Sequence, residues 1–168
     1  MIALLKRIAA PQFGRRSNAA HPLACANAII EELRADKQAV ATGIRINRLL
    51  VIADCWSLDL LKRPLHSGET YYLAGTPTVT SVYSALRCYG SDEVTGFAKH
   101  PQLHGIDYPA LEPGPEREIL ASVVQSYRNI APYSLGNILR QRVTSPKNNG
   151  LISDAALAKF AERSNKRL

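Results

Sequence analysis

Hydrophobic residues recur along the chain at the three- to four-residue spacing of helices that bury one face. The first helix is expected over residues 22–35, where Pro22 suits a first helical position. The second is expected from about Arg45 to Leu61, and apolar residues cover so much of its circumference that it should be central. Pro64 is expected to end it, because the residue before a proline is pushed out of helical geometry.

The segment after this helix has the pattern of a short strand followed by a tight corner. Glu69–Leu73 contains two tyrosines, which favour a strand, and Gly75 and Pro77 mark the corner. A further amphipathic stretch follows, and Thr78 or Thr80 is expected to cap it by accepting a backbone N–H bond.

The second half of the chain predicts three more helices after a weak region. Val94–Ala98 is a candidate second strand. A helix should begin at Pro115, because acids occupy its first turn and a clean apolar stripe follows. Ser134 and Ser153 are expected to cap two shorter helices. We therefore predict a mainly α, compact single domain of five or six helices, with a small β-hairpin or short strands.

The charge distribution adds a feature that periodicity does not show. The chain has 168 residues, 46% hydrophobic and 21% charged, which fits one globular domain, and its net charge is +7. The residues before Glu31 include no acid. We divide the chain into a flexible basic N-terminal arm, residues 1–20, and a helical domain, residues 21–165. The charge favours an acidic partner, such as nucleic acid, an acidic protein or an anionic membrane surface.

The N-terminal arm, the apolar runs and the cysteines together indicate where in the cell the protein is located. The arm lacks the order of a secretory signal, while an organelle transit peptide stays open for a eukaryotic source. No apolar run approaches the length that a membrane crossing needs. Cys25, Cys55 and Cys88 are odd in number and irregularly spaced, which predicts free, buried thiols in a reducing cytoplasm.

No recognisable motif for catalysis or cofactor binding is present. The glycines form no phosphate-binding loop, and no nucleophile elbow occurs. His100 and His104 are four apart, but Pro101 and Gly105 argue against the helix that would align them on a metal. Asp54 lies on the second helix and is expected to pair with an arginine at the helix edge. Arg45 and Arg87 are both candidates for that arginine. We therefore expect no enzyme, no metal and no cofactor.

The order of several short motifs resembles Panacea-domain proteins, the antitoxin-type family also described as SocA-like or phage-associated. The matching segments are ACANAII (Ala24–Ile30), NRLLVIAD (Asn47–Asp54), KRPL (Lys62–Leu65), GTPTVTSVY (Gly75–Tyr83), EILASVVQSY (Glu118–Tyr127) and Ser134–Leu139. Thr76 stands where the family has glycine before the proline, Arg48 where it has lysine, and Val51 where it has tyrosine. The family's later histidine and its Pro-Trp pair are missing.

The resemblance implies a non-enzymatic antitoxin that binds and neutralises a toxin encoded nearby, and that in some members hands the toxin to a protease. It sets no oligomeric state and no toxin identity. The candidate partner contacts are Arg63, Tyr71, Tyr72, Pro77 and Tyr83 at the corner, with Arg15 and Arg16 of the arm. Pro77 and Tyr83 equally suit a structural role there. The alternative function is a basic nucleic-acid-binding or regulatory protein of phage or mobile-element origin, and an enzyme with an unrecognised site is a third.

Overall fold

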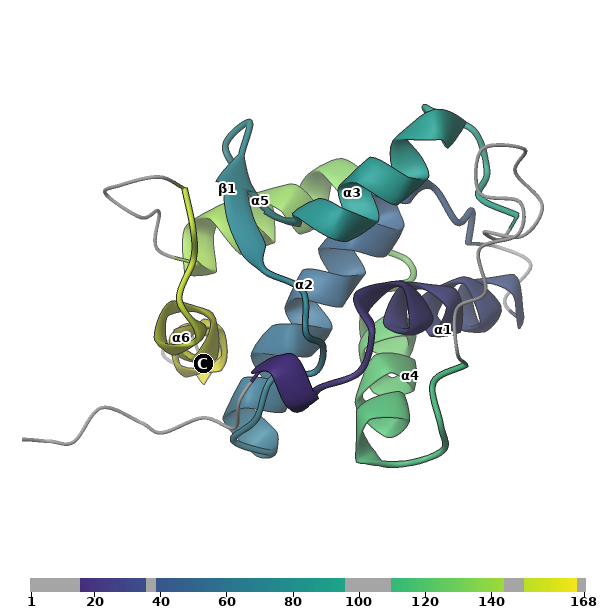
Figure 1. The fold of residues 1–168 in the computed structure, drawn as a ribbon. Coiled ribbons are helices and arrows are strands. Elements are labelled where there is room, and N and C mark those ends of the chain that lie inside the picture. Colours follow the sequence, from purple (N-terminus) through teal and green to yellow (C-terminus); the bar gives the residue numbers. More distant parts are fainter. Residues whose placement is uncertain (1–15, 36–38, 96–109, 144–149, 166–168) are drawn as a thin grey trace, which may run out of the picture.

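The helix α2 (Gly43–Leu60) is the centre of the computed structural model. Leu49–Cys55 is buried without interruption over nearly two helical turns, so α2 is covered on every side. It packs against all the other α-helices of the described residues. These are α1 (Pro22–Ala35), α3 (Thr80–Leu86), α4 (Pro115–Tyr127), α5 (Pro132–Arg142) and α6 (Asp154–Asn165). Figure 1 shows α2 running through the middle, with α6 on one side and α1 and α4 on the other. The predicted central helix is confirmed.

The structure describes residues 16–35, 39–95, 110–143 and 150–165. Within these ranges there are six α-helices, two short 3-10 helices (Arg16–Asn18 and Arg87–Tyr89) and one two-stranded hairpin. The prediction of a mainly α, compact single domain with a small hairpin is therefore confirmed. None of the helices in these ranges combines the length and the apolar character that crossing a membrane requires.

The hairpin joins β1 (Thr70–Leu73) to β2 (Thr76–Val79) in antiparallel register, with Leu73 opposite Thr76. Ala74 and Gly75 have φ values of 46° and 78°, both left-handed, as in the primed turns that match the twist of two-residue hairpins. The chain before α6 runs along the other edge of β1. There Tyr72 N donates to Gly150 O at 2.6 Å, and Ile152 N donates to Thr70 O at 2.9 Å.

The end of α2 differs from its prediction. The helix ends at Leu60 because Lys62 adopts a left-handed φ of 56°, so Pro64 follows the helix end without causing it. Two side chains of α2 then bind the returning chain. Ser57 Oγ donates to Arg63 O at 2.8 Å, and Leu65 N donates to Asp54 Oδ1 at 2.8 Å.

The start of α3 is also held differently from the prediction. Its N-cap residue is Val79, no side chain caps it, and neither Thr78 nor Thr80 accepts the bond expected of them. Instead, Asn47 of α2 holds both backbone polar groups of Val79. Val79 N donates to Asn47 Oδ1 at 3.0 Å, and Asn47 Nδ2 donates to Val79 O at 2.9 Å. A buried amide from another element thus fixes the residue from which α3 begins.

Of the remaining predictions, one helix cap is confirmed, whereas the other cap and the second strand are not. Ser153 caps α6 as predicted, since its Oγ accepts from Ala156 N at 3.3 Å. Ser134 does not cap α5, because that helix begins earlier, at Pro132, which suits a first helical position. Val94 belongs to no strand, although Val94 N donates to Ala41 O at 2.7 Å, and the rest of that candidate strand lies outside the described residues.

Candidate partner-binding site

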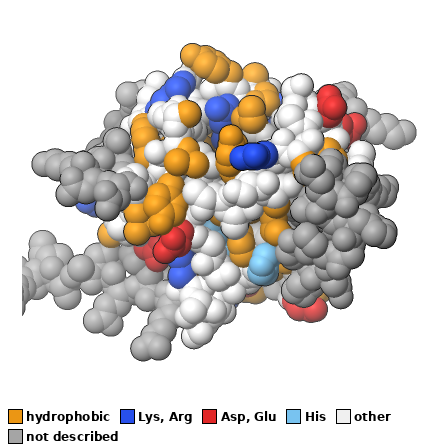
Figure 2. All heavy atoms as spheres, turned by 45° about the horizontal axis from the view of Figure 1, so that its top comes forward, with side chains coloured by type: hydrophobic (Ala, Val, Ile, Leu, Met, Phe, Trp, Pro, Cys, Tyr) orange, Lys and Arg blue, Asp and Glu red, His pale blue; other side chains and the backbone are white. Residues whose placement is uncertain are grey.

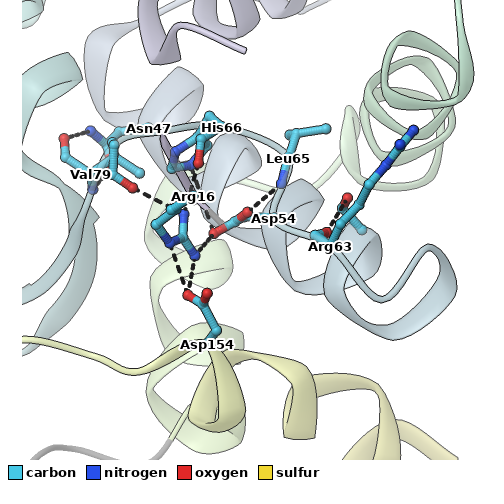
Figure 3. Close-up of polar contacts among 10 residues, drawn as sticks. Arg16, Asn47, Asp54, Arg63, Leu65, His66, Val79 and Asp154 are labelled. Atoms are coloured by element: carbon cyan, nitrogen blue, oxygen red, sulfur yellow. Dashed lines mark hydrogen bonds and ion pairs between the residues drawn. The ribbon is translucent and has the colours of Figure 1, made fainter. Parts of the chain in front are cut away.

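Arg16 is the first residue that the structure describes, and it lies inside a polar cluster between α2 and α6. Its Nη2 donates to Asp54 Oδ2 at 2.7 Å, and its Nε donates to Asp154 Oδ1 at 2.9 Å. Its Nη1 donates to the carbonyl oxygens of His66 and Gly68, both at 3.0 Å. Figure 3 shows Arg16 pointing between the two carboxylates. The expectation that Asp54 pairs with Arg45 or Arg87 is wrong.

The electrostatics of this cluster follow from burial. Burial alone lowers the pKa of Arg16, but the charges of Asp54 and Asp154 and their hydrogen bonds outweigh it and raise that pKa. The side chain of Asp54 is fully buried, so it needs the guanidinium as its counter-charge. The residues before Pro22 are thus attached to the domain from Arg16 onward, and Ser67 N donates to Ala20 O at 2.8 Å.

His66 is fully buried beside the same carboxylate. Its Nε2 lies 3.9 Å from Asp54 Oδ2, and neither ring nitrogen makes a hydrogen bond of ordinary geometry to the residues that the structure describes. Burial lowers the pKa of His66, and the positive charge of Arg16 lowers it further, against the opposing effect of Asp54. The imidazole is therefore neutral in the folded protein at neutral pH.

The six sequence-predicted contacts that the structure describes do not form one surface. Tyr72 and Pro77 are opposite each other in the hairpin, where Pro77 is buried and Tyr72 packs partly against the core. Tyr71 lies on the other face and donates its hydroxyl to Glu69 Oε2 at 3.0 Å. That hydrogen bond and the charge of Glu69 raise the pKa of Tyr71. Tyr83 is half exposed on α3.

The arginine candidates are also dispersed. Arg63 forms an ion pair with Glu116, and both line a hollow of about 490 Å³. Arg16 occupies the internal cluster with Asp54, and Arg15 lies outside the described residues.

Tyr83 belongs to a groove that the sequence analysis did not identify. We call it the α2–α3 groove: a hollow of about 250 Å³ between the first turn of α2, the hairpin tip and α3. Three apolar side chains around it are exposed to solvent, Ile44 by 54%, Tyr83 by 50% and Leu73 by 38%. Asn47 lines its base and so links the groove to the start of α3. A smaller hollow of about 40 Å³ adjoins it, shares Ile44 and Tyr83 with it, and extends to Arg87.

Arg48 supplies positive charge to the α2–α3 groove. Its side chain lines the hollow, and its Nη1 donates to Pro132 O. This position depends on Gly136 of α5, where a Cβ atom would lie 2.8 Å from Arg48 Cζ. Partial burial lowers the pKa of Arg48, and the charge of nearby Arg140 lowers it further. Figure 2, which brings the top of Figure 1 forward, shows orange and blue side chains intermixed on this side of the molecule.

Among the described residues, no group of three His, Cys, Asp or Glu side chains is placed to hold a metal ion. His100 and His104 lie outside them. Cys25 and Cys55 are free and buried as predicted, while Cys88 is half buried. Burial raises the pKa of Cys25 to about 12, which makes its thiol a poor nucleophile.

Comparisons of the chain with protein-family models, with curated proteins and with solved structures found no match.

Proposed function

We propose that this chain is a non-enzymatic, antitoxin-type protein that neutralises a toxin encoded nearby by direct protein–protein contact. The main support is the α2–α3 groove, where Ile44, Leu73 and Tyr83 are exposed together. Such clustered apolar surface with a polar rim is typical of protein-binding sites. The order of motifs from Asn47–Asp54 to Gly75–Tyr83, which resembles the Panacea-domain pattern, also supports the proposal, because these two segments supply part of the groove lining, including Arg48 and Tyr83.

The test is neutralisation and co-purification. The adjacent open reading frame is expressed alone, and then together with this chain. The proposal expects growth arrest from the neighbour alone, rescue on co-expression, and a stable complex. A neighbour that leaves growth unchanged and forms no complex with this chain would remove the proposal.

A basic nucleic-acid-binding or regulatory protein is the second candidate, because the net charge is +7. Such binding should weaken steeply as salt is added, since phosphate contacts release counterions. Retardation of a DNA or RNA probe at low salt, lost at higher salt, would support this candidate. Failure to retard either probe at low salt would exclude it.

A further inference from the structure

We infer that the α2–α3 groove binds an acidic, amphipathic segment of the partner protein, which under the proposed function is the toxin. Apolar side chains of that segment would occupy the hollow beside Ile44, Leu73 and Tyr83. Its carboxylates would lie beside Arg48, Arg87 and Arg140.

The size of the hollow favours side chains as its occupants. Pockets for whole small molecules usually measure about 300–1,000 Å³. At about 250 Å³ the hollow is smaller than that range. Together with the smaller hollow that extends to Arg87, it has the form of a groove in which an extended or helical segment can lie. The groove therefore suits one or two anchoring side chains of a longer chain.

The charge around the groove favours an acidic occupant. No Asp or Glu lines either hollow, and no ion pair to Arg48, Arg87 or Arg140 occurs in the described part of the chain. Arg140 is close enough to Arg48 for the two like charges to disfavour each other. The N-terminal end of α2, at Gly43, adds the positive end of the helix dipole to this charge. The first turn of the helix contains no acidic residue that would offset it.

Two arginines at the surface elsewhere are neutralised by acids of the protein itself. Arg63 pairs with Glu116, and Arg117 pairs with Glu31. The α2–α3 groove thus combines arginines that have no carboxylate partner among the described residues with three exposed apolar side chains. A carboxylate of a partner would supply that missing charge, with Arg48 and Arg140 as its hydrogen-bond donors.

The apolar walls favour a protein over a nucleic acid. Single-stranded nucleic acids bind to basic grooves in which aromatic side chains stack on the bases. Here Ile44 and Leu73 are aliphatic, and Tyr83 alone among the residues lining the described hollow is aromatic. Aliphatic side chains of a protein segment would desolvate these walls, whereas a phosphate backbone would not.

The first test uses a synthetic probe and does not depend on identifying the toxin. The probe is an acidic peptide of about 15 residues, with Leu on one helical face and Glu elsewhere, titrated into the isotope-labelled full chain by NMR. A matched peptide carries Lys in place of Glu. We expect the Glu peptide to shift resonances of Ile44, Leu73 and Tyr83, and the Lys peptide to bind at least about tenfold more weakly.

Variants then locate the binding. Tyr83→Ala removes an aromatic side chain that lines the hollow, and Arg140→Glu reverses a charge beside Arg48. Each is expected to weaken binding of the Glu peptide by about tenfold or more. Leu60→Ala and Lys159→Glu are the matched controls, since both residues are exposed on α2 and α6 outside the groove. Circular dichroism checks that each variant is folded.

Four results would overturn the inference. They are the absence of shifts in the groove, equal binding of the two peptides, equal shifts from an oligonucleotide, and concentration-dependent shifts without peptide, which would indicate self-association.

The same four variants are then tested against the neighbour-encoded protein. This test distinguishes failure of the antitoxin proposal from failure of the inference about the groove. If wild type and all four variants neutralise it equally, the antitoxin proposal stands and the inference about the groove is wrong. If the neighbour is harmless and unbound, the antitoxin proposal fails and the peptide titration alone decides what the groove binds.

Discussion

Arg16 and Asn47 each join segments that lie far apart in the chain. Arg16 supplies the counter-charge of Asp54, which lies 38 residues later in the chain. Asn47 binds the backbone of Val79, 32 residues later. The sequence indicates that Asp54 needs an arginine, because a carboxylate on an apolar helix must be paired. It does not indicate which one, since many arginines satisfy the same chemical requirement.

Arg16→Ala is expected to lower the free energy of unfolding by about 3 kcal/mol, because it leaves the buried carboxylate of Asp54 without its counter-charge. This expected loss is at the low end of the range for breaking a buried ion pair, because the Arg16 side chain is 18% exposed. Urea denaturation measures it. Arg117→Ala, which breaks a more exposed ion pair with Glu31, is the matched control. It should lower the free energy of unfolding by no more than about 1 kcal/mol. Equal losses would contradict the special role of Arg16.

His66 should make stability depend on pH. Its pKa is lowered in the folded protein, whereas the unfolded chain has the ordinary value of about 6.5. Below that pH the unfolded chain takes up a proton that the folded chain excludes, so stability falls as the pH falls. His66→Gln should flatten this slope by up to about 1.4 kcal/mol per pH unit between about pH 6.5 and the lowered pKa. Parallel stability curves for wild type and variant would exclude the effect.

At the scale of elements, local signals and distant contacts share control of where each helix begins and ends. Pro115 and Ser153 mark helix starts correctly, because a proline at the first position and a serine cap act within one turn. Thr78, Thr80 and Ser134 were not used as caps, although the residue types are suitable. In the case of α3, a side chain from another helix instead holds the backbone of the N-cap residue Val79.

The hairpin turn allows a test at this scale. Ala74 has a left-handed φ of 46°, which costs about 1–2 kcal/mol for a residue with a Cβ atom. Ala74→Asn should therefore stabilise the protein by about 0.5–1 kcal/mol and raise Tm by about 2 °C, because asparagine tolerates this conformation.

Gly75→Ala is the opposing control for the turn. An added Cβ atom meets nothing within 4 Å, so its expected loss of about 1 kcal/mol comes from the backbone alone. Thermal unfolding measures both variants. A shift in the same direction for both would contradict this account of the turn.

At the scale of the whole molecule, α2 makes the domain one structural unit. Every other α-helix in the described ranges contacts it, and its central turns contact no solvent. Trp56 of α2 lies edge-on to Tyr127 of α4, with ring centroids 6.2 Å apart, so its fluorescence reports on the packing of these two helices. Loss of one helix contact should therefore weaken the whole domain together.

We expect urea to unfold the protein in a single transition, with coincident midpoints by Trp56 fluorescence and by circular dichroism. Leu50→Ala should shift both midpoints equally and cost about 3 kcal/mol, since Leu50 is fully buried. Leu60→Ala, at a 63% exposed position of the same helix, should cost under about 0.5 kcal/mol. Separate transitions by the two probes would show that the domain is divided.

The candidate site was less predictable than the fold. Tyr83 was identified from its motif, whereas Ile44 and Leu73 were not, because an apolar residue on a helix or strand is normally buried. Arg48 was recognised only as a departure from the family's lysine. Whether these side chains remain exposed depends on how α2, the hairpin and α3 meet.

The sequence indicated five or six helices, their approximate limits and the central place of α2. It could do so because hydrophobic periodicity and turn residues act over a few neighbouring positions. The packing of the elements brought Arg16 to Asp54 and Asn47 to the start of α3, and it gathered Ile44, Leu73 and Tyr83 in one groove. These relations join residues tens of positions apart, and only the packing of whole elements brings such residues together.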